Sequence, residues 1–259
     1  MSNPLRLIAI ALQFLTRLPI TLRTPPTDIE VGYSLLCYPL VGLLIGGALM
    51  GLAMLCQAHL PPLPAAALLL TVWIGIYGGL HLDGLADSAD AWAGSRGEAV
   101  RALAIMKDPN CGPLGGVAII VVLLLKFAAL ASLLSASMNT NAKEPASLLL
   151  LPLLITPMLG RTVLLPLFMT THYVRAQGLG TAMHAHLPHR AAWFMIALMT
   201  VVLFGFLGHA FIPVALAVLI SFVALRWIMC RVIGGMTGDT AGATVEIVEA
   251  MVLLGFLWH

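Results

Sequence analysis

Charged residues are scarce in this chain. Only 9% of its 259 residues are Asp, Glu, Lys or Arg, compared with about 25% in soluble globular domains. Hydrophobic residues make up 60% of the chain, which excludes an ordinary soluble domain. The formal net charge of +2 is too small to indicate a nucleic-acid-binding protein. We therefore predict an integral membrane protein in contact with lipids.

Two kinds of sequence motif are also missing. The order GxxxxGK[ST] of a Walker A phosphate-binding loop does not occur. Cysteines are few and form no CxxC pair, so we expect neither a disulfide framework nor a cysteine metal site. The four cysteines are Cys37, Cys56, Cys111 and Cys230.

Long apolar stretches are abundant. A bilayer core requires about 20 residues of helix, and seven stretches are long enough to qualify. They cover residues 32–57, 63–82, 114–137, 146–170, 191–209, 211–232 and 239–258. We predict an all-α, polytopic transmembrane bundle of about seven spans, forming one domain over residues 1–259. The fifth and sixth spans can also be divided differently around Pro213.

The N-terminal segment predicts an amphipathic helix at the membrane surface. Its apolar core is too short and too interrupted for a signal peptide. On a helical wheel Arg6, Gln13 and Arg17 share one face. Pro25 and Pro26 are expected to end the helix. Two roles remain open, a membrane anchor or a helix whose Arg17 faces an anionic site.

Basic residues predict the orientation. If the N-terminus is placed on one side, that side receives nearly all arginines and lysines of the loops, and the other side keeps only Lys143. By the positive-inside rule the N-terminal side is cytoplasmic. The long polar loops then face the cytoplasm.

Three aspartates are unexpected in so apolar a chain. Asp83, Asp87 and Asp90 are spaced i, i+4 and i+7, which places them within about 60° of one another around a helix. Like charges this close repel one another. Such an arrangement is favourable mainly when a hard cation lies among the carboxylates, and oxygen ligands suit Mg²⁺. We therefore predict a magnesium site on this helix face.

The loop after the aspartates contains a candidate phosphate-binding segment. Lys107 and Asp108 precede a glycine-containing run that leads into the next span. Free N–H groups at a helix entrance favour anions, so Lys107 and this run either bind phosphate or form an ordinary turn. Asp108 is either another metal ligand or a turn residue.

Two cations fall inside predicted spans. Burial of charge in a membrane is costly, so Lys126 and Arg161 are expected to face the bundle interior. Arg161 is a candidate phosphate clamp, because guanidinium binds phosphate bidentately. The alternative is an interhelical salt bridge with Glu246 or Glu249. For Lys126 we favour a structural partner or snorkelling.

The last span carries an acidic stripe. Asp239, Gly242, Glu246 and Glu249 lie within roughly 80° on a helix. Together with Asp83 this stripe can close a metal site, or it can form a cation path.

The loop 171–190 holds an HxHxxH pattern that suggests zinc, although a solvated loop is the simpler interpretation. Its histidines are His184, His186 and His189.

Several motifs occur in an order that resembles the cobalamin synthase family, the adenosylcobinamide-GDP ribazoletransferases. The resemblance covers nearly the whole chain, and the combination of the HxDGxAD core with the C-terminal GDT is specific. The motifs are FLTRLP (14–19), YPLVGLLIG (38–46), HLDGLADSAD (81–90), MKD (106–108), Arg175 with GLG (178–180), and GDT (238–240) with Gly242 and Glu246.

The resemblance implies an enzyme of the bacterial inner membrane that assembles the nucleotide loop of cobalamin. A ribose hydroxyl of α-ribazole, or of its 5′-phosphate, would attack adenosylcobinamide-GDP and release GMP, with Mg²⁺ as cofactor. Asp83 and Asp87 would bind the metal, and Asp90 would be a further ligand or the base. Lys107 would act in catalysis. Substrate contacts would come from Arg17, His81, Arg161, Arg175, Asp239 and Glu246.

Some positions depart from the family pattern, namely Ala91, Ala104 and the run 110–114, so the preferred lower base can differ. A homo-oligomer or a complex with other cobalamin-assembly enzymes is possible. Three other functions fit the sequence less well. A CDP-alcohol phosphotransferase requires a longer aspartate pattern than this chain has. A secondary transporter usually binds between internal repeats near the bilayer midplane, and no repeat is visible. An inactive assembly subunit has no need of so much charge on one side.

Overall fold

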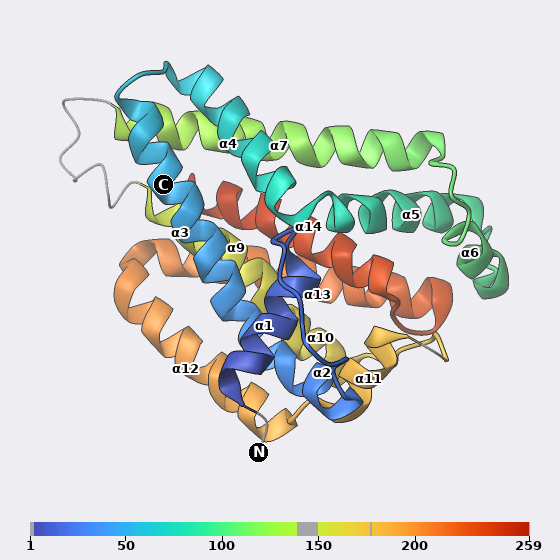
Figure 1. The fold of residues 1–259 in the computed structure, drawn as a ribbon. Helices are drawn as coiled ribbons and strands as arrows, with labels where there is room; N and C mark the ends of the chain where they lie inside the picture. The colour runs from blue at the N-terminus through green and yellow to red at the C-terminus, as the bar shows by residue number, and fades with distance from the viewer. Residues whose placement is uncertain (1–2, 139–149, 177, 259) are drawn as a thin grey trace.

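A computed structural model describes residues 3–138, 150–176 and 178–258 (Figure 1). The expectation for Lys143 lies outside these residues. Apart from an isolated bridge between Tyr173 and Met236, the described residues form helices and their connections. The helices are α1 Pro4–Leu15, α2 Asp28–Ser34, η1 Leu35–Cys37, α3 Tyr38–Gln57, α4 Pro62–Tyr77, α5 Leu80–Gly94, α6 Ala99–Ile105, α7 Pro113–Ser137, α9 Leu151–Thr162, α10 Leu164–Thr170, α11 Leu179–His186, α12 His189–Leu207, η2 Gly208–Ala210, α13 Phe211–Ile233 and α14 Gly238–Phe256.

The prediction of an all-α membrane bundle is confirmed, but the span count is lower than expected. By length and composition, four runs in the described residues can cross a membrane, or up to five if the bent pair α4 and α5 is one span. The run 189–233 contains both the fifth and the sixth predicted spans. Helix α14 is not among the four, because its apolar sequence is interrupted by Asp239, Glu246 and Glu249. The chain is a multi-pass membrane protein.

The second predicted span does not continue straight to residue 82. Helix α4 ends at Tyr77 and α5 leaves it at an angle of 88°. Gly78 and Gly79 make this bend with φ values of 65° and 75°, which side chains other than glycine rarely adopt. The aspartate helix α5 therefore runs between α7 and α14 in Figure 1, outside the four apolar runs.

The N-terminal helix is shorter than predicted. It ends at Leu15, where Thr16 becomes extended and donates its hydroxyl hydrogen bond to the Leu12 carbonyl (2.7 Å). Arg17 therefore lies outside the helix, with its backbone N–H donating to the Ile76 carbonyl (2.7 Å). Arg6 instead forms an ion pair with Glu30 of α2 (2.7 Å). Arg6 and Arg17, which were predicted to share one helix face, therefore contact different helices, α2 and α4.

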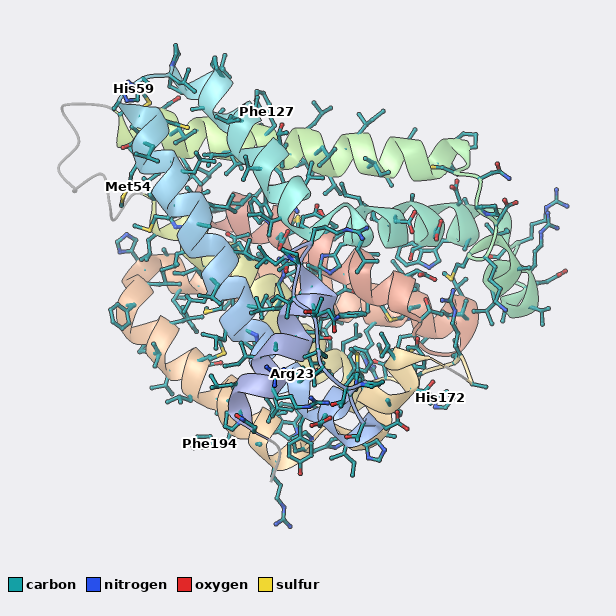
Figure 2. All side chains as sticks on the ribbon, viewed as in Figure 1. Arg23, Met54, His59, Phe127, His172 and Phe194 are labelled. Carbon is teal, nitrogen blue, oxygen red and sulfur yellow. The ribbon has the colours of Figure 1, made fainter. Side chains whose placement is uncertain are left out.

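Close packing of helices surrounds a buried α14. This helix contacts α5, α7, α9 and α13 and is buried along most of its length. Helices α3 and α9 approach so closely that a Cβ on Gly42 or Gly46 would lie under 3 Å from the α9 backbone. By contrast, α12 lies at the edge of the bundle, and side chains such as Phe194 point outward from it (Figure 2). An exposed apolar helix of this kind fits a lipid environment.

Candidate functional site

A cavity of about 300 Å³ brings together residues from distant parts of the sequence. The end of α1, the starts of α3, α5, α11 and α14, helix α10 and the loop before α11 all contribute to it. Its walls contain most of the motif segments that the sequence singles out. The lining residues are Phe14, Leu15, Tyr38, Leu80, His81, Asp83, Leu164, Phe168, Tyr173, Arg175, Gly178, Leu179, Gly180, Met183, Gly238, Asp239, Ala241 and Gly242.

The acidic wall is made where α5 crosses α14. A Cβ on Gly84 would lie 2.6 Å from the Asp239 carbonyl oxygen, so only glycine permits this approach. The crossing brings Asp83 and Asp87 of α5 near Asp239 of α14. Burial and the charges of Asp83, Asp239 and Asp90 raise the pKa of Asp87 to about 6. This wall therefore carries more negative charge than its surroundings neutralise.

Arg175 is the cation nearest to this acidic wall. Its Nη2 lies 2.6 Å from Oδ2 of Asp239. The loop that carries it is held by backbone hydrogen bonds on either side of the bridge to Met236, from Val174 N–H (3.0 Å) and to the His172 carbonyl (2.8 Å). Burial raises the pKa of Asp239, and Arg175 opposes that rise. The Arg175 loop motif and the GDT motif, which are separate in the sequence, therefore meet in space.

Asp90 faces a different partner. Its two carboxylate oxygens accept hydrogen bonds from the backbone N–H groups of Gly112 (2.7 Å) and Gly115 (2.9 Å), at the start of α7. A carboxylate at this position accepts hydrogen bonds from N–H groups that have no partner within the helix, and the positive end of the helix dipole stabilises its charge. Among the described residues no three His, Cys, Asp or Glu side chains are grouped closely enough to hold a metal. The three aspartates of α5 therefore do not form the predicted three-ligand cradle in this structure.

The glycine-containing run after Lys107 supplies the two N–H groups that bind Asp90. The N–H groups of Gly112 and Gly115 bind Asp90 instead of being free for phosphate. Asp108 accepts hydrogen bonds from the backbone N–H (2.9 Å) and side chain (2.8 Å) of Asn110. These bonds lower the pKa of Asp108 and identify it as the turn residue, one of the two alternatives that the sequence left open.

Lys107 lines a second hollow that adjoins the cavity. This hollow has a volume of about 660 Å³ and is lined by residues of α6, the turn after it and the loop 174–176. Arg175 lines both spaces, so it stands between them. The Lys107 side chain is exposed here. The structure therefore places two of the predicted phosphate-binding cations beside one hollow.

Arg161 and Glu246 are not exposed to the cavity. Both are fully buried, and Arg161 forms an ion pair with Glu249. Lys126 lies 2.6 Å from carboxylate oxygens of both Glu246 and Glu249. The interhelical salt bridge is therefore the arrangement found for Arg161, and the predicted substrate contacts of Arg161 and Glu246 have no support in this geometry. We refer to Lys126, Arg161, Glu246 and Glu249 as the buried ion cluster.

His81 and Arg17 differ in their relation to the cavity. His81 lines it, stacks on the Tyr77 ring at 5.2 Å between centroids, and has no hydrogen-bond partner for Nδ1 within the described part of the chain. Arg17 does not line the cavity. Its side chain packs against Gly78 at the α4–α5 bend, where any Cβ would collide with it. The structure thus gives Arg17 a packing contact in place of the predicted anionic site.

The histidines of the loop 171–190 form no metal site among the described residues. His184 contacts the Phe168 carbonyl through Nδ1 (2.9 Å) and the His172 ring at 6.1 Å. The backbone and Cβ of His186 pack against Gly32. These contacts join the loop to α10 and α2, which is a packing role.

Aromatic residues of the cavity were missed by the sequence reasoning. Phe14, Tyr38, Phe168 and Tyr173 all line it. Three of them could have been found by their position in the sequence. Phe14 and Tyr38 lie inside the family motifs, and Tyr173 precedes Arg175 by two residues. Phe168 lies in an apolar run with nothing to distinguish it.

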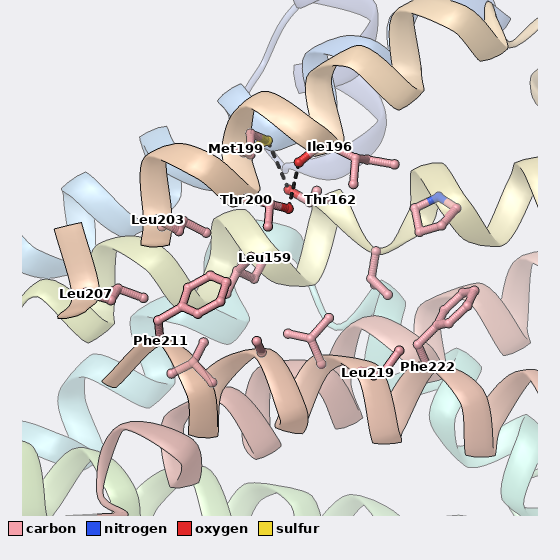
Figure 3. Close-up of a pocket in the computed structure, with 15 residues that line it drawn as sticks. Leu159, Thr162, Ile196, Met199, Thr200, Leu203, Leu207, Phe211, Leu219 and Phe222 are labelled. Atoms are coloured by element: carbon pink, nitrogen blue, oxygen red, sulfur yellow. Dashed lines mark hydrogen bonds between the residues drawn. The ribbon is translucent and has the colours of Figure 1, made fainter. Parts of the chain in front are cut away.

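A third space, of about 300 Å³, is chemically different (Figure 3). It lies between α12 and α13, against α9 and α10, and its walls are almost entirely apolar. The hydroxyls of Thr162 and Thr200 in it donate to the carbonyls of their own helices, Thr162 also contacting the Met199 sulfur. No charged side chain lines this space, in contrast to the polar cavity with Asp83, Arg175 and Asp239.

Comparison with known proteins identifies relatives of the chain. A family model described as cobalamin-5-phosphate synthase matches residues 7–257. An adenosylcobinamide-GDP ribazoletransferase of Pseudomonas fluorescens is 48% identical over 246 residues, covering 95% of this chain and 96% of that protein. Proteins of the same name from Pseudomonas putida (50% over 246 residues; 95% and 96% covered) and Acinetobacter baumannii (45% over 250 residues; 96% and 95% covered) are similar. No solved structure matches the chain significantly. This chain belongs to the cobalamin-5-phosphate synthase family.

Proposed function

We propose that this chain is an adenosylcobinamide-GDP ribazoletransferase. It joins adenosylcobinamide-GDP to α-ribazole or its 5′-phosphate, forms adenosylcobalamin or its 5′-phosphate, and releases GMP. The observation that carries this proposal is the polar cavity. Segments around Asp83, Arg175 and Asp239, which are far apart in the sequence and carry the family motifs, meet there beside Lys107.

The cavity suits a phosphoryl transfer. A ribose hydroxyl oxygen forms a new bond to the cobinamide-side phosphorus, the bond from that phosphorus to the bridging oxygen breaks, and GMP leaves with that oxygen. The hydroxyl proton passes to a carboxylate of the acidic wall. Arg175 and Lys107 are the cations positioned to neutralise phosphate charge, which is the main requirement of this chemistry.

Mg²⁺ fits the donor set of the acidic wall. Asp83, Asp87 and Asp239 supply only oxygen donors, and their charge exceeds what Arg175 neutralises. Mg²⁺ is commonly held by one or two carboxylates together with substrate phosphates, so a cluster of three protein ligands is not required. When bound, the ion would neutralise charge on the transferred phosphoryl group.

We also propose that the cavity faces the cytoplasm in a bacterial inner membrane. The basic residues on the side of the cavity, including Arg96, Arg101 and Lys107, support this orientation. A cysteine introduced at Glu98, which is exposed, should react with a membrane-impermeant reagent only from the cytoplasmic side. Labelling from the opposite side would reverse the orientation.

The function is tested by product release. Purified protein in detergent, given adenosylcobinamide-GDP, α-ribazole 5′-phosphate and Mg²⁺, should release GMP, and chelation of Mg²⁺ should stop the release. Monodisperse protein that releases no GMP under these conditions would overturn the proposal.

A further inference from the structure

One wall of the polar cavity is aromatic. The rings of Phe168 and Tyr173 lie nearly parallel, with centroids 6.2 Å apart and an angle of 16°. Phe14 and Tyr38 form a second stacked pair at 6.3 Å and 21°. Both pairs line the same cavity as Arg175 and the acidic residues. A ligand in this cavity therefore has both aromatic and charged side chains around it.

Tyr173 is held in place by the glycine loop that follows it. A Cβ on Gly180 would overlap the Tyr173 ring, so this position accepts only glycine while the ring stays where it is. Gly178 has a φ of 120°, which also favours glycine. The GLG motif thus serves to position an aromatic side chain, two residues from the cation that contacts Asp239.

The size of the cavity limits what can occupy it. At about 300 Å³ it lies at the lower end of the range for ligand pockets. A nucleoside fits such a volume, whereas a corrin macrocycle with its side chains is several times larger. The hollow beside Lys107, on the other side of Arg175, is larger and more open. The two substrates of the proposed reaction therefore have two different spaces available, with Arg175 between them.

The chemistry of the aromatic wall distinguishes between the two bases in the reaction. Around the rings the wall is made of apolar side chains such as Leu15, Leu164 and Met183, and the Tyr38 hydroxyl already contacts the Met183 sulfur (3.7 Å). Guanine carries several polar groups on its edge, and those that face this wall instead of Asp83, Arg175 or Asp239 would be left unpaired at a considerable cost. The benzimidazole of α-ribazole has an apolar edge and loses no hydrogen bond there.

We propose that the aromatic cavity is the subsite for the benzimidazole base of α-ribazole, with Tyr173 as a specificity-determining residue, and that the diphosphate end of the corrinoid donor lies in the Lys107 hollow. This assignment rests on the proposed function. Arg175 then lies where the ribose of one substrate meets the diphosphate of the other.

The assignment is tested by binding and by kinetics. Tyr173→Leu should weaken binding of α-ribazole, measured by equilibrium dialysis without the donor, by about tenfold or more, because base–aromatic stacking is lost. In the GMP-release assay its KM for α-ribazole should rise by a similar factor, while its KM for adenosylcobinamide-GDP stays within about twofold. Tyr173→Phe should retain both values, because the ring remains.

Controls separate the subsite from general damage. Tyr33→Leu removes an exposed tyrosine outside the cavity and should change neither KM. Lys107→Met should raise the KM of the donor alone. Guanosine should not displace α-ribazole from the wild-type protein, and displacement at equal concentration would contradict the apolar assignment.

The outcomes are distinguishable from those for the function itself. If the wild-type protein binds α-ribazole in a Tyr173-dependent way but releases no GMP, the subsite stands and the function fails. If it releases GMP but Tyr173→Leu leaves α-ribazole binding unchanged, or raises only the donor KM, the subsite assignment is overturned. If the wild-type protein does neither, both proposals fail.

Discussion

Two groups of charged side chains in this bundle differ in how their charges are balanced. The buried ion cluster contains two cations and two carboxylates, all fully buried and in direct contact. The acidic wall sets Asp83, Asp87 and Asp239 against one nearby guanidinium, that of Arg175, and borders a cavity.

This difference shows how charge in an apolar chain should be interpreted. Charge buried within a membrane protein is expensive, and the sequence alone offers functional candidates in both groups, with Arg161 and Glu246 among those of the buried ion cluster. The buried ion cluster has equal numbers of positive and negative charges, and its ion pairs join α7, α9 and α14, although Arg161 Nε and Nη2 and Glu246 Oε1 have no hydrogen-bond partner among the described residues. The acidic wall carries surplus negative charge beside an open space, which is the property expected of a cation-binding site.

Breaking the buried ion cluster should have the largest effect. Glu249→Gln leaves Arg161 without its carboxylate partner, and removing one member of a buried ion pair costs about 3–5 kcal/mol. The unfolding temperature in detergent should fall by roughly 10 °C, with poor recovery of folded protein. Glu98→Gln, at an exposed glutamate, should leave it unchanged. A stable Glu249→Gln protein would remove the distinction between the two groups.

Removing charge from the acidic wall should lower activity without lowering stability, whereas breaking the buried ion cluster should lower stability. Asp83→Asn should lower the rate of GMP release on the order of a hundredfold or more, while the unfolding temperature stays the same or rises because repulsion is relieved. The concentration of Mg²⁺ needed for half-maximal rate should increase. Asp28→Asn, at an exposed aspartate of α2, is the matched control. Full activity in Asp83→Asn would show that this carboxylate does not hold the metal.

Asp90 should give the smallest effect and the sharpest comparison. Asp90→Ala removes the acceptor for two N–H groups of α7, which costs about 1 kcal/mol of stability and lowers the unfolding temperature by a few degrees. GMP release per folded molecule should fall less than tenfold. If it falls as far as in Asp83→Asn, Asp90 belongs to the metal site as the sequence predicts, and its contact with α7 is secondary.

The sequence predicts local features well because they depend on neighbouring residues. The helix that carries the three aspartates, the long apolar runs and the burial of Lys126 follow from spacing and hydropathy. The partner of a side chain cannot be read in this way. Asp90 shares a helical face with Asp83, yet it lies about two turns further along the helix, where it meets the N-terminus of α7.

Tertiary contacts also explain what the sequence left open. Two alternatives for Arg161 remained because its position along α9 fits either a cavity or a partner helix, and only the packing of α14 decides between them. The right-angle bend at Gly78 was hidden inside an apolar run. The four aromatic residues of the cavity come from four separate segments, so no local sequence pattern predicts that they meet.

The crossing of α5 and α14 at Gly84 has a consequence for how the protein becomes active. Asp83 lies in the first half of the chain, and Asp239 is supplied by the last helix that the structure describes. During synthesis the earlier helices are made and inserted without their acidic counterpart. The cavity that we propose as the catalytic centre is therefore complete only when α14 has docked, and we expect a chain that lacks α14 to be inactive.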